Sequence, residues 1–549
     1  MEETFTNNTC SPNFISSSLP YLFLDSEFTS PIALSLAFII FMFLVKFILR
    51  THNKNSVLVV PLPPGPSPWP IVGCLPEMWR NRPAHRWIHS LMKKLNTDIA
   101  CIRLGNVHVI PVTSPEIARE FLKKNDAVFA SRPVTMATKT LSSGYLTTVV
   151  GPWGDQWKKM RRVLVADAFN PSRVHWLLGK RNEEADNLVK FLYNQCSANQ
   201  NGAVVNVRIA AQFYSGSIMR KMIFNRTYFG KGSEDGGPGV EEEEHVSALL
   251  TLLTYAYAFC ISDYLPWLRV FDINGHEKKV RKAMNIVKKH QEPIVKERLQ
   301  EWRDGKRNEP DDLLDVFISL KDANGQPLLS DEEIKAQTTE LQLSTVDSPF
   351  NVAEWALTEM LNQPEMLKKA EEELDRVVGK KTLVQESHVP HLPYIRACAK
   401  EVMRLHPVGP FNLPHVSIAD AEVAGYFIPK GSNVILSRLG LGRNPRVWEE
   451  PLRFNPERHL SRAVDQRVDL EENDLRFVSF STGRRGCMGV GLGSTIVVML
   501  LARLLQGFSW SLPPDVDKID FTEDQIYLKK ASPLFAQAKP RLPASVYPK

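Results

Sequence analysis

The amino-acid sequence predicts one large domain, mainly α with small β-sheets, behind an N-terminal transmembrane helix. First, the chain has 549 residues, 43% of them hydrophobic, which is ample material for a large core. Second, long segments carry apolar residues at helical spacing, whereas the β-rich segments are short. Third, one uncharged apolar run stands near the N-terminus, and no interior Gly/Ser-rich linker divides the rest. We therefore expect a single membrane-anchored domain.

The apolar run predicts a transmembrane anchor over residues 31–50. Residues 31–45 carry no charge, and the run continues past Lys46 to Leu49, close to the ~20 residues that a bilayer helix needs. Acidic residues precede the run and basic residues follow it, so the following chain is expected on the cytosolic side. The features of a cleaved signal peptide, a basic leader and a small-residue cleavage site, are missing. The sequence thus predicts a luminal tail over 1–30 and a single pass, with a buried core helix as the alternative.

Residues 51–70 predict a basic and Pro-rich hinge. The stretch PLPPGPSPWP at its end combines fixed φ angles with missing N–H donors, which gives a semi-rigid, extended spacer. The domain itself is expected over 71–549. Its apolar periodicity predicts helices over 115–124, 157–168, 241–259 and 277–303, and its β-rich stretches predict hairpins or a small sheet over 101–112 and 423–437.

Charge and cysteine spacing exclude several classes of protein. Lys plus Arg number 67 against 61 acidic residues, and a net charge of +6 over this length is too mild to indicate a nucleic-acid partner. The seven cysteines stand far apart without a CxxC pair, so neither a disulfide framework nor a zinc knuckle fits. A cysteine that does chemistry must therefore do it alone.

One cysteine stands in a strongly patterned loop, FVSFSTGRRGCMGVGLG, at 477–493. The five specified positions of the pattern FxxGxRxCxG are occupied by Phe480, Gly483, Arg485, Cys487 and Gly489. This loop resembles the haem-thiolate signature of the cytochrome P-450 monooxygenases. The alternative is a Gly-rich turn that holds a buried cysteine.

The resemblance implies a cytochrome P-450 fold, with Cys487 as the axial ligand of the iron of haem b. A thiolate ligand favours O–O cleavage, and N–H donors near the sulfur keep it ionised. Gly483 and Gly489 are expected to take positive φ around the sulfur. The apolar run after Met488 is expected to begin a helix whose positive end points at the thiolate. Arg485 is then expected to reach a haem propionate.

Further motifs agree with this interpretation. Trp157 and Arg161 match the family's WxxxR pattern, in which both residues contact a haem propionate. His415 stands where relatives place an Arg or His on the other propionate; a satisfied loop histidine is the alternative. Glu401 and Arg404 lie three residues apart on one helix face. A third motif supplies Arg458, and the three residues resemble the family's structural Glu/Arg/Arg cluster.

The oxygen-activating helix is expected over 330–362, where Ser330 and the acidic residue three positions later form a capping box. Near its centre the superfamily usually has an acidic residue followed by threonine, and this chain has Asp347 and Ser348. A hydroxyl beside a carboxylate can relay protons, which is the general-acid task of the catalytic cycle. Pro349 removes an N–H group, so a kink is expected there; the alternative is a helix end that splits the segment in two.

Several stretches resemble one plant family, the aldoxime-forming amino acid N-monooxygenases. They are RPAHRWIHSLMKKLNTDIACIRLGN, HPVGPFNLPHVS, GRNPRVW, SFSTGRRGC and the proline after Asp347-Ser348. The resemblance covers residues from about 62 to 548; relatives commonly carry Asn in place of Ser348 and HPVAP in place of HPVGP. It implies two N-hydroxylations of an L-amino acid, then decarboxylation and dehydration to the aldoxime, in plant specialised metabolism of the glucosinolate or cyanogenic glycoside type.

The same resemblance implies the partners. Electrons are expected from NADPH through NADPH-cytochrome P-450 reductase, O2 is the co-substrate, and the chain is expected in the endoplasmic reticulum membrane. A buried substrate carboxylate needs a cation or several donors, and Arg132 is one candidate, although a structural role is the favoured alternative. Phe411, Asn412 and Ser532 are expected to line the pocket. Basic residues that could dock the reductase, or else form a solvated face, are Lys158, Lys159, Arg162 and Arg484.

Three other functions remain open from the sequence. The first is a plant cytochrome P-450 that hydroxylates C–H bonds in another small-molecule pathway. The second is a haem-thiolate isomerase that rearranges hydroperoxides without O2 or a reductase. The third is a membrane-tethered binding protein that has lost catalysis. The sequence itself names neither the amino acid nor the pathway.

Overall fold

The computed structural model describes residues 35, 38, 40–42, 45, 60–197, 201–232, 234–256, 258–460 and 468–549. The chain divides into two units, Met1–Val59 and Val60–Lys549. The predicted luminal tail lies outside the described residues, as do most of the anchor and the first nine residues of the hinge. Within the anchor, the six described residues are helical, and four of them are apolar with 52 to 64% of their surface exposed: Phe38, Ile40, Phe41 and Met42.

Among the described residues, one helix is long and apolar enough to cross a bilayer, α19 (Val490–Gly507). Because 78% of it is buried inside the fold, it has the surroundings of a core helix. The predicted anchor therefore stays a prediction.

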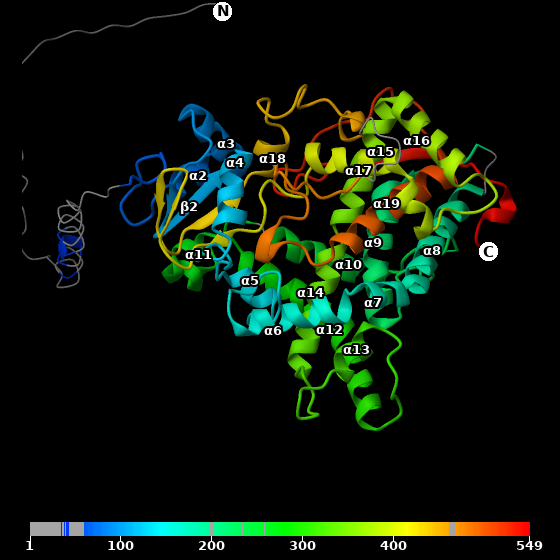
Figure 1. Ribbon diagram of the computed structural model, residues 1–549, viewed down its shortest axis with the longest axis horizontal. Helices are drawn as coiled ribbons and strands as arrows, with labels where there is room; N and C mark the ends of the chain where they lie inside the picture. The colour runs from blue at the N-terminus through cyan, green and yellow to red at the C-terminus, as the bar shows by residue number, and fades with distance from the viewer. Residues whose placement is uncertain are drawn as a thin grey trace, which may run out of the picture. The chain divides into compact units, whose positions relative to one another are not determined.

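The second unit is mainly helical, as the sequence predicts (Figure 1). The expected helix over 277–303 is α12 (His276–Arg303), and the one over 241–259 is α10 (Val240–Ala256). Each of the other two expected helices is an α-helix followed by a short π-helix. The first is α4 (Pro115–Arg119) followed by Glu120–Lys124, and the second is α6 (Asp155–Val163) followed by Leu164–Ala168. The remaining α-helices up to residue 320 are α2 (Leu75–Arg80), α3 (Ala84–Lys94), α5 (Met136–Leu141), α7 (Pro171–Trp176), α8 (Leu178–Ser197), α9 (Val207–Phe224), α11 (Ile261–Tyr264) and α13 (Leu313–Ser319).

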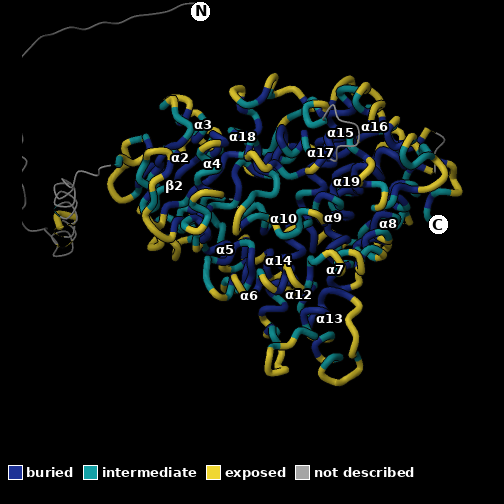
Figure 2. The backbone as a smooth tube through the Cα atoms, in the orientation of Figure 1, coloured by how far each residue is buried: buried dark blue, intermediate teal, exposed yellow. Residues whose placement is uncertain are grey.

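Helices from both halves of the chain build the core, with α8, α9 and α10 contributing from the first half. The helices from the second half include α14 (Asp331–Thr345), α15 (Ser348–Asn362), α16 (Pro364–Val377), α17 (Pro393–Leu405), α18 (Arg438–Gly442) and α19. Helix α15 packs against α9, α17 and α19, and its Trp355 is fully buried. Figure 2 shows buried residues concentrated along α15, α17 and α19. These helices fix the position of the loop that carries Cys487, which directly precedes α19.

Short strands form three small sheets in the described part of the chain. The first has the order β1 (Ile102–Leu104), β2 (Val107–Val112), β7 (Asn433–Leu436), β4 (His415–Val416), with β2 and β7 parallel and the other pairs antiparallel. The second is antiparallel, in the order β3 (Ala203–Asn206), β9 (Phe535–Pro540), β8 (Phe508–Ser511), and the third is the hairpin β5 (Ala421–Val423) with β6 (Tyr426–Ile428). The expected hairpin at 101–112 is confirmed, whereas the stretch 423–437 divides between the β5–β6 hairpin and the first sheet.

The long helix expected over 330–362 is instead two helices, so the expectation of one kinked helix was wrong. The capping box is present: Ser330 caps α14, and Glu333 accepts a hydrogen bond from the Ser330 backbone at 2.8 Å. Helix α14 ends at Thr345 and α15 begins at Ser348, with Val346 and Asp347 between them. Pro349 has no N–H group to donate to the carbonyl four residues earlier, which breaks the hydrogen-bond ladder at this point. The alternative of a split segment is confirmed.

Candidate active site

The Cys487 loop is held tightly by its own backbone. The Cys487 N–H donates to the Phe480 carbonyl at 2.9 Å, and the Gly486 N–H donates to the Gly483 carbonyl at 3.0 Å. Gly483 has φ +71°, as predicted, and a Cβ there would lie 2.6 Å from the Leu122 carbonyl oxygen. Side chains other than hydrogen do not fit at this position, so the loop depends on this glycine.

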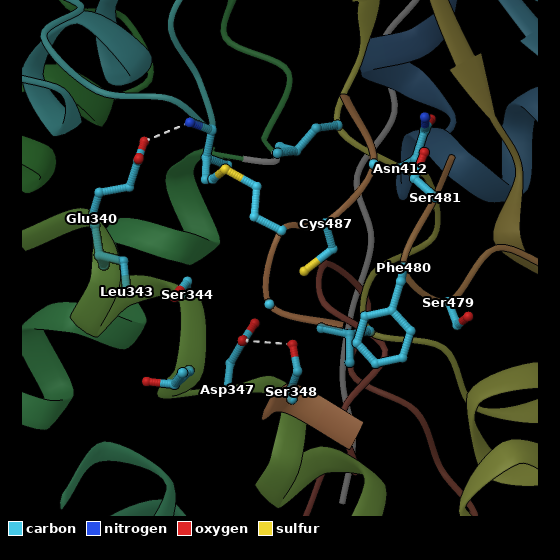
Figure 3. Close-up of a pocket in the computed structure, with 18 of the residues that line it drawn as sticks. Glu340, Leu343, Ser344, Asp347, Ser348, Asn412, Ser479, Phe480, Ser481 and Cys487 are labelled. Atoms are coloured by element: carbon cyan, nitrogen blue, oxygen red, sulfur yellow. Dashed lines mark hydrogen bonds between the residues drawn. The ribbon is translucent and has the colours of Figure 1, made fainter. Parts of the chain in front are cut away.

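The Cys487 thiol faces an internal cavity. The residue has accessible surface, yet protein surrounds the thiol, and Figure 3 shows its Sγ directed into the cavity. Burial raises the pKa of this thiol, while the Gly489 N–H and the charge of Arg161 act against the rise. Gly489 has φ −96° and precedes α19 as its N-cap, so the expected positive φ is wrong there. The helix that follows begins as predicted, with its N-terminus beside the sulfur.

Helix α14 forms the opposite wall of the cavity. Glu340, Leu343, Ser344 and Asp347 are spaced so that one face of the helix and its C-terminal end carry all four. Figure 3 shows this face across the cavity from Cys487. The cavity is therefore bounded by a sulfur on one side and by polar and apolar groups of a helix on the other.

Three arginines and a tryptophan line one edge of this cavity. Arg485 donates to the Ala130 carbonyl and, through Nη1, to the Thr148 carbonyl at 3.0 Å. Trp157 Nε1 donates to the same Thr148 carbonyl at 3.0 Å. Arg161 Nη1 donates to the Gly486 carbonyl at 3.1 Å, which ties the WxxxR pair to the Cys487 loop.

The third arginine, Arg132, is bound to main-chain carbonyls. Its Nε donates to Val149 at 3.2 Å, and its Nη1 donates to Leu413 and Pro414 at 2.9 Å each. These contacts give it the structural role that the sequence analysis favoured over substrate binding.

We call Arg132, Arg161, Arg485, Trp157 and the neighbouring His415 the cationic edge; the charge of Glu340 acts on Arg485 against the charges of Arg132 and Arg161. Burial, followed by the charges of Arg132 and Arg161, lowers the pKa of Arg485 to about 8. Arg485 Nη2 is buried and has no hydrogen-bond partner in the described part of the chain. His415 Nε2 also has no hydrogen-bond partner among the described residues. Its Nδ1–H donates to the Phe129 carbonyl at 2.8 Å, and burial lowers the pKa of the imidazole, so Nε2 carries no proton in the neutral ring.

Glu340 was missed by the sequence analysis, although it lies in α14, seven residues before Asp347. Its carboxylate accepts hydrogen bonds from the Thr148 N–H and hydroxyl, both at 2.9 Å, and from the Val149 N–H at 2.8 Å. The carbonyls of Thr148 and Val149 are those that accept from Trp157, Arg485 and Arg132. Glu340 thus positions the loop that orients the cationic edge.

Asp347 and Ser348 lie where α14 ends, inside the cavity wall. The Ser348 hydroxyl donates to Asp347 Oδ1 at 3.0 Å, and the Tyr527 hydroxyl donates to Asp347 Oδ2. Burial raises the pKa of Asp347 to about 6, against the hydrogen bonds from Ser348. No motif in the sequence indicates Tyr527, because its role depends on a partner 180 residues away.

The predicted Glu/Arg/Arg cluster is confirmed and contains a fourth member. Arg404 binds Glu401 through two hydrogen bonds of 2.7 and 2.8 Å, Arg458 Nε donates to Glu401 at 3.0 Å, and His459 Nε2 lies 2.8 Å from it. Burial raises the pKa of Glu401, but the hydrogen bonds from Arg404 and His459 prevail and lower it to about 2. The four residues form a closed, fully paired cluster away from the cavity wall.

The remaining predicted residues differ in position. Asn412 lines the Cys487 cavity, whereas Phe411 lines a neighbouring one. Ser532 is exposed and lines neither cavity, so this prediction was wrong; its carbonyl accepts a hydrogen bond from Arg208. Three of the four basic residues expected to dock a partner are ion-paired with carboxylates of the chain: Lys158 with Asp155, Lys159 with Glu333, and Arg484 with Asp126.

The site fits haem better than a metal bound by side chains alone. Within the described ranges, no group of three or more His, Cys, Asp and Glu side chains could hold a metal ion. A haem brings anionic propionates for the unpartnered donor of Arg485, Nη2, and an iron atom for the thiol of Cys487. The donor, the thiol and the cavity therefore match the needs of one cofactor.

The comparisons with known proteins agree. The cytochrome P-450 family matches residues 63–537, and the chain belongs to this family. A solved zebrafish cytochrome P-450 with progesterone superimposes with a TM-score of 0.68 at 21% identity, covering 84% of this chain and all of that one. The predicted fold and haem-iron chemistry are confirmed.

The relatives are plant enzymes. A tryptophan N-monooxygenase of Prunus mume is 97% identical over 531 residues, which cover 97% of this chain and all of that protein. A phenylalanine N-monooxygenase of Arabidopsis thaliana is 57% identical, covering 93% and 98% of the two chains. A tryptophan N-monooxygenase of the same plant is 49% identical over 99% of both. These relatives confirm the prediction of an amino acid N-monooxygenase.

Proposed function

We propose that this cytochrome P-450 converts L-tryptophan to the corresponding aldoxime. The observation that carries the choice of amino acid is the 97% identity with a tryptophan N-monooxygenase. Two N-hydroxylations each consume one O2 and one NADPH and release one water. The N,N-dihydroxy amino acid then loses CO2 and one further water, which leaves the C=N–OH group. The balance closes without any other oxidant.

Haem b, when bound, supplies O2 activation and the oxidising equivalent for each N-hydroxylation. Cys487 would hold the iron through its sulfur. Arg485, His415, Trp157 and Arg161 would bind the propionates, and the backbone of the loop at Gly483 would keep the thiol in place. Glu340 holds the 148–149 loop so that the donors of the cationic edge keep their direction.

Asp347 and Ser348 hold and move protons. A carboxyl group whose pKa is near 6 takes up and releases a proton close to neutral pH. The Ser348 hydroxyl, which donates to Asp347 Oδ1, passes that proton between the carboxyl and the cavity. The break between α14 and α15 places Asp347 and Ser348 in the cavity wall. In an unbroken helix, the backbone groups at this point would be paired with each other.

The electrons come from NADPH through NADPH-cytochrome P-450 reductase. The chain lies in the endoplasmic reticulum membrane as a single-pass protein, with residues 1–30 luminal, 31–50 as anchor, 51–70 as hinge and 71–549 as the cytosolic catalytic domain. Lys158, Lys159, Arg162 and Arg484 contribute to the reductase face together with the carboxylates that pair three of them. The aldoxime enters plant specialised metabolism of the glucosinolate or cyanogenic glycoside type.

The test is turnover by the full chain in membranes with a reductase, NADPH and O2. Each of the protein amino acids is supplied in turn, and products are identified by mass. Aldoxime from L-tryptophan supports the proposal. A hydroxylated product that keeps its amino group would instead support a C-hydroxylating enzyme, and aldoxime from another amino acid alone would contradict the choice of tryptophan.

A further inference from the structure

Asn412 lies where two cavities meet. It lines the Cys487 cavity, and it also lines a second cavity that reaches Tyr264 in α11 and Asn433 in β7. Its side chain is 4% exposed. Figure 3 shows Asn412 on a different wall of the Cys487 cavity from α14. A polar side chain so deeply buried is normally hydrogen-bonded at every polar atom.

The orientation of the Asn412 amide is fixed by its neighbour on β7. The Leu436 N–H donates to Asn412 Oδ1 at 2.8 Å, and the Asn412 N–H donates to the Leu436 carbonyl at 3.1 Å. Because an N–H group can donate only to the oxygen of the amide, the oxygen must face Leu436 and Nδ2 must face away. Nδ2 is buried and has no hydrogen-bond partner among the described residues. The amide therefore presents an unused donor in the wall of the cavity.

A positive charge lines the same cavity. Arg438, two residues after Leu436, lines the Cys487 cavity. Its N–H donates to the Pro410 carbonyl at 2.9 Å, and its Nη1 donates to the Val408 carbonyl, so the segment that precedes Asn412 holds it in place. The charge of Arg438 acts against the rise in the pKa of Asp347, so its field reaches the catalytic carboxyl.

We propose that Asn412 Nδ2 and the Arg438 guanidinium bind the α-carboxylate of the amino acid substrate. The inference rests on the proposed function, because it takes an amino acid as the substrate. A buried carboxylate needs a cation and hydrogen-bond donors, and this cavity offers one of each on adjacent segments. Arg132 is less suited, since its three hydrogen bonds to carbonyls hold the 413–414 loop.

The test compares two ligands that differ by the carboxylate, L-tryptophan and tryptamine. Dissociation constants are measured from the shift of the haem Soret band in the purified holoenzyme. Asn412→Asp keeps the oxygen that binds Leu436 and replaces only the donor with a second, negative oxygen. We expect the dissociation constant of L-tryptophan to rise about tenfold to a hundredfold, as for a lost charge-assisted hydrogen bond, with tryptamine unchanged or tighter.

Asn433→Asp is the matched control. It places the same new charge in the second cavity, outside the subsite of Asn412 and Arg438, and we expect less than about a threefold change for either ligand. Arg438→Gln is the second variant, because it removes the charge and keeps an N–H donor for Val408. It should weaken L-tryptophan binding in the same direction, with tryptamine unaffected. The carbon monoxide spectrum verifies that each variant keeps its haem.

The outcomes separate this inference from the proposed function. If the wild type makes aldoxime and Asn412→Asp weakens both ligands equally, or neither, the carboxylate subsite is wrong and the proposed function stands. If the wild type makes no aldoxime yet the variants weaken L-tryptophan alone, the subsite stands and the reaction is wrong. A wild type that does not bind L-tryptophan overturns both.

Discussion

Two buried clusters of arginines differ in whether the chain itself supplies the balancing charge. In the first, Arg404 and Arg458 bind the carboxylate of Glu401, whose pKa falls to about 2 because of its hydrogen bonds despite burial. In the cationic edge, Arg485 donates to two main-chain carbonyls and lies over the Trp157 ring, and burial with neighbouring arginines lowers its pKa to about 8 against the charge of Glu340. The Glu401 cluster, which contains its own carboxylate, stabilises the fold. The cationic edge can bind an anion that a ligand supplies.

The largest effect is expected from breaking the closed cluster. Glu401→Gln leaves two buried arginines without a counter-charge, which costs about 3–5 kcal/mol of folding free energy. Soluble yield and the midpoint of thermal unfolding measure it. The control is Glu450→Gln, which removes an exposed pair with Arg453 and should cost less than about 1 kcal/mol. Equal losses of folding free energy in Glu401→Gln and Glu450→Gln would contradict the distinction between the buried cluster and an exposed ion pair.

The second prediction concerns pH and Asp347. Its pKa of about 6 in the fold exceeds the unfolded value of about 3.9, so the proton favours the folded state. The stabilising contribution is complete below about pH 4 and is lost as pH rises through 6. Asp347→Asn carries no charge, so its unfolding free energy relative to the wild type should rise between about pH 4 and 7, within an upper limit of roughly 3 kcal/mol. Denaturant unfolding at several pH values measures it, and a difference independent of pH would contradict it.

The third prediction concerns Arg485 in the cationic edge. Arg485→Met removes a buried charge whose Nη2 has no hydrogen-bond partner among the described residues, so haem affinity should fall about tenfold to a hundredfold while the haem-free fold keeps or gains stability. The haem-to-protein ratio and the thermal unfolding of the haem-free fraction measure the two parts. If Arg485→Met loses as much stability as Glu401→Gln, Arg485 stabilises the fold as the Glu401 cluster does.

The smallest effect is expected from Glu340. Glu340→Gln keeps an acceptor for the Val149 N–H but removes the charged oxygen that binds Thr148 twice, a loss of about 1–2 kcal/mol. Haem retention should fall less than for Arg485→Met, because the change acts through the 148–149 loop. The control is Glu332→Gln on the exposed face of α14, where Glu332 pairs with Lys335. If Glu340→Gln loses no more haem than Glu332→Gln, Glu340 does not position the cationic edge.

The cofactor side of the site could be predicted from the sequence because its residues follow fixed local spacings. Phe480, Gly483 and Cys487 belong to one loop, and the Cys487 N–H bonds the Phe480 carbonyl within it. Trp157 and Arg161 are neighbours on one helix face. In such motifs, local backbone geometry decides where each side chain points, so the spacing carries the information.

The rest depends on contacts between distant segments. Glu340 acquires its role from a loop 191 to 192 residues away, and Tyr527 meets Asp347 across 180 residues. Periodicity continued through Asp347, so it concealed the break that Pro349 imposes on the helix. Ser532 was placed by its motif alone, and the strand that follows it pairs with β3 and β8 instead of the cavity wall.

The carbon monoxide spectrum of the reduced, purified protein tests the central claim, that the cationic edge and Cys487 hold a haem-thiolate, most directly. The wild type should show the long-wavelength Soret band of thiolate ligation, and Cys487→Ser should lose that band while keeping its helical content. A folded wild type that binds haem without this band, or a Cys487→Ser variant that retains it, would contradict the account.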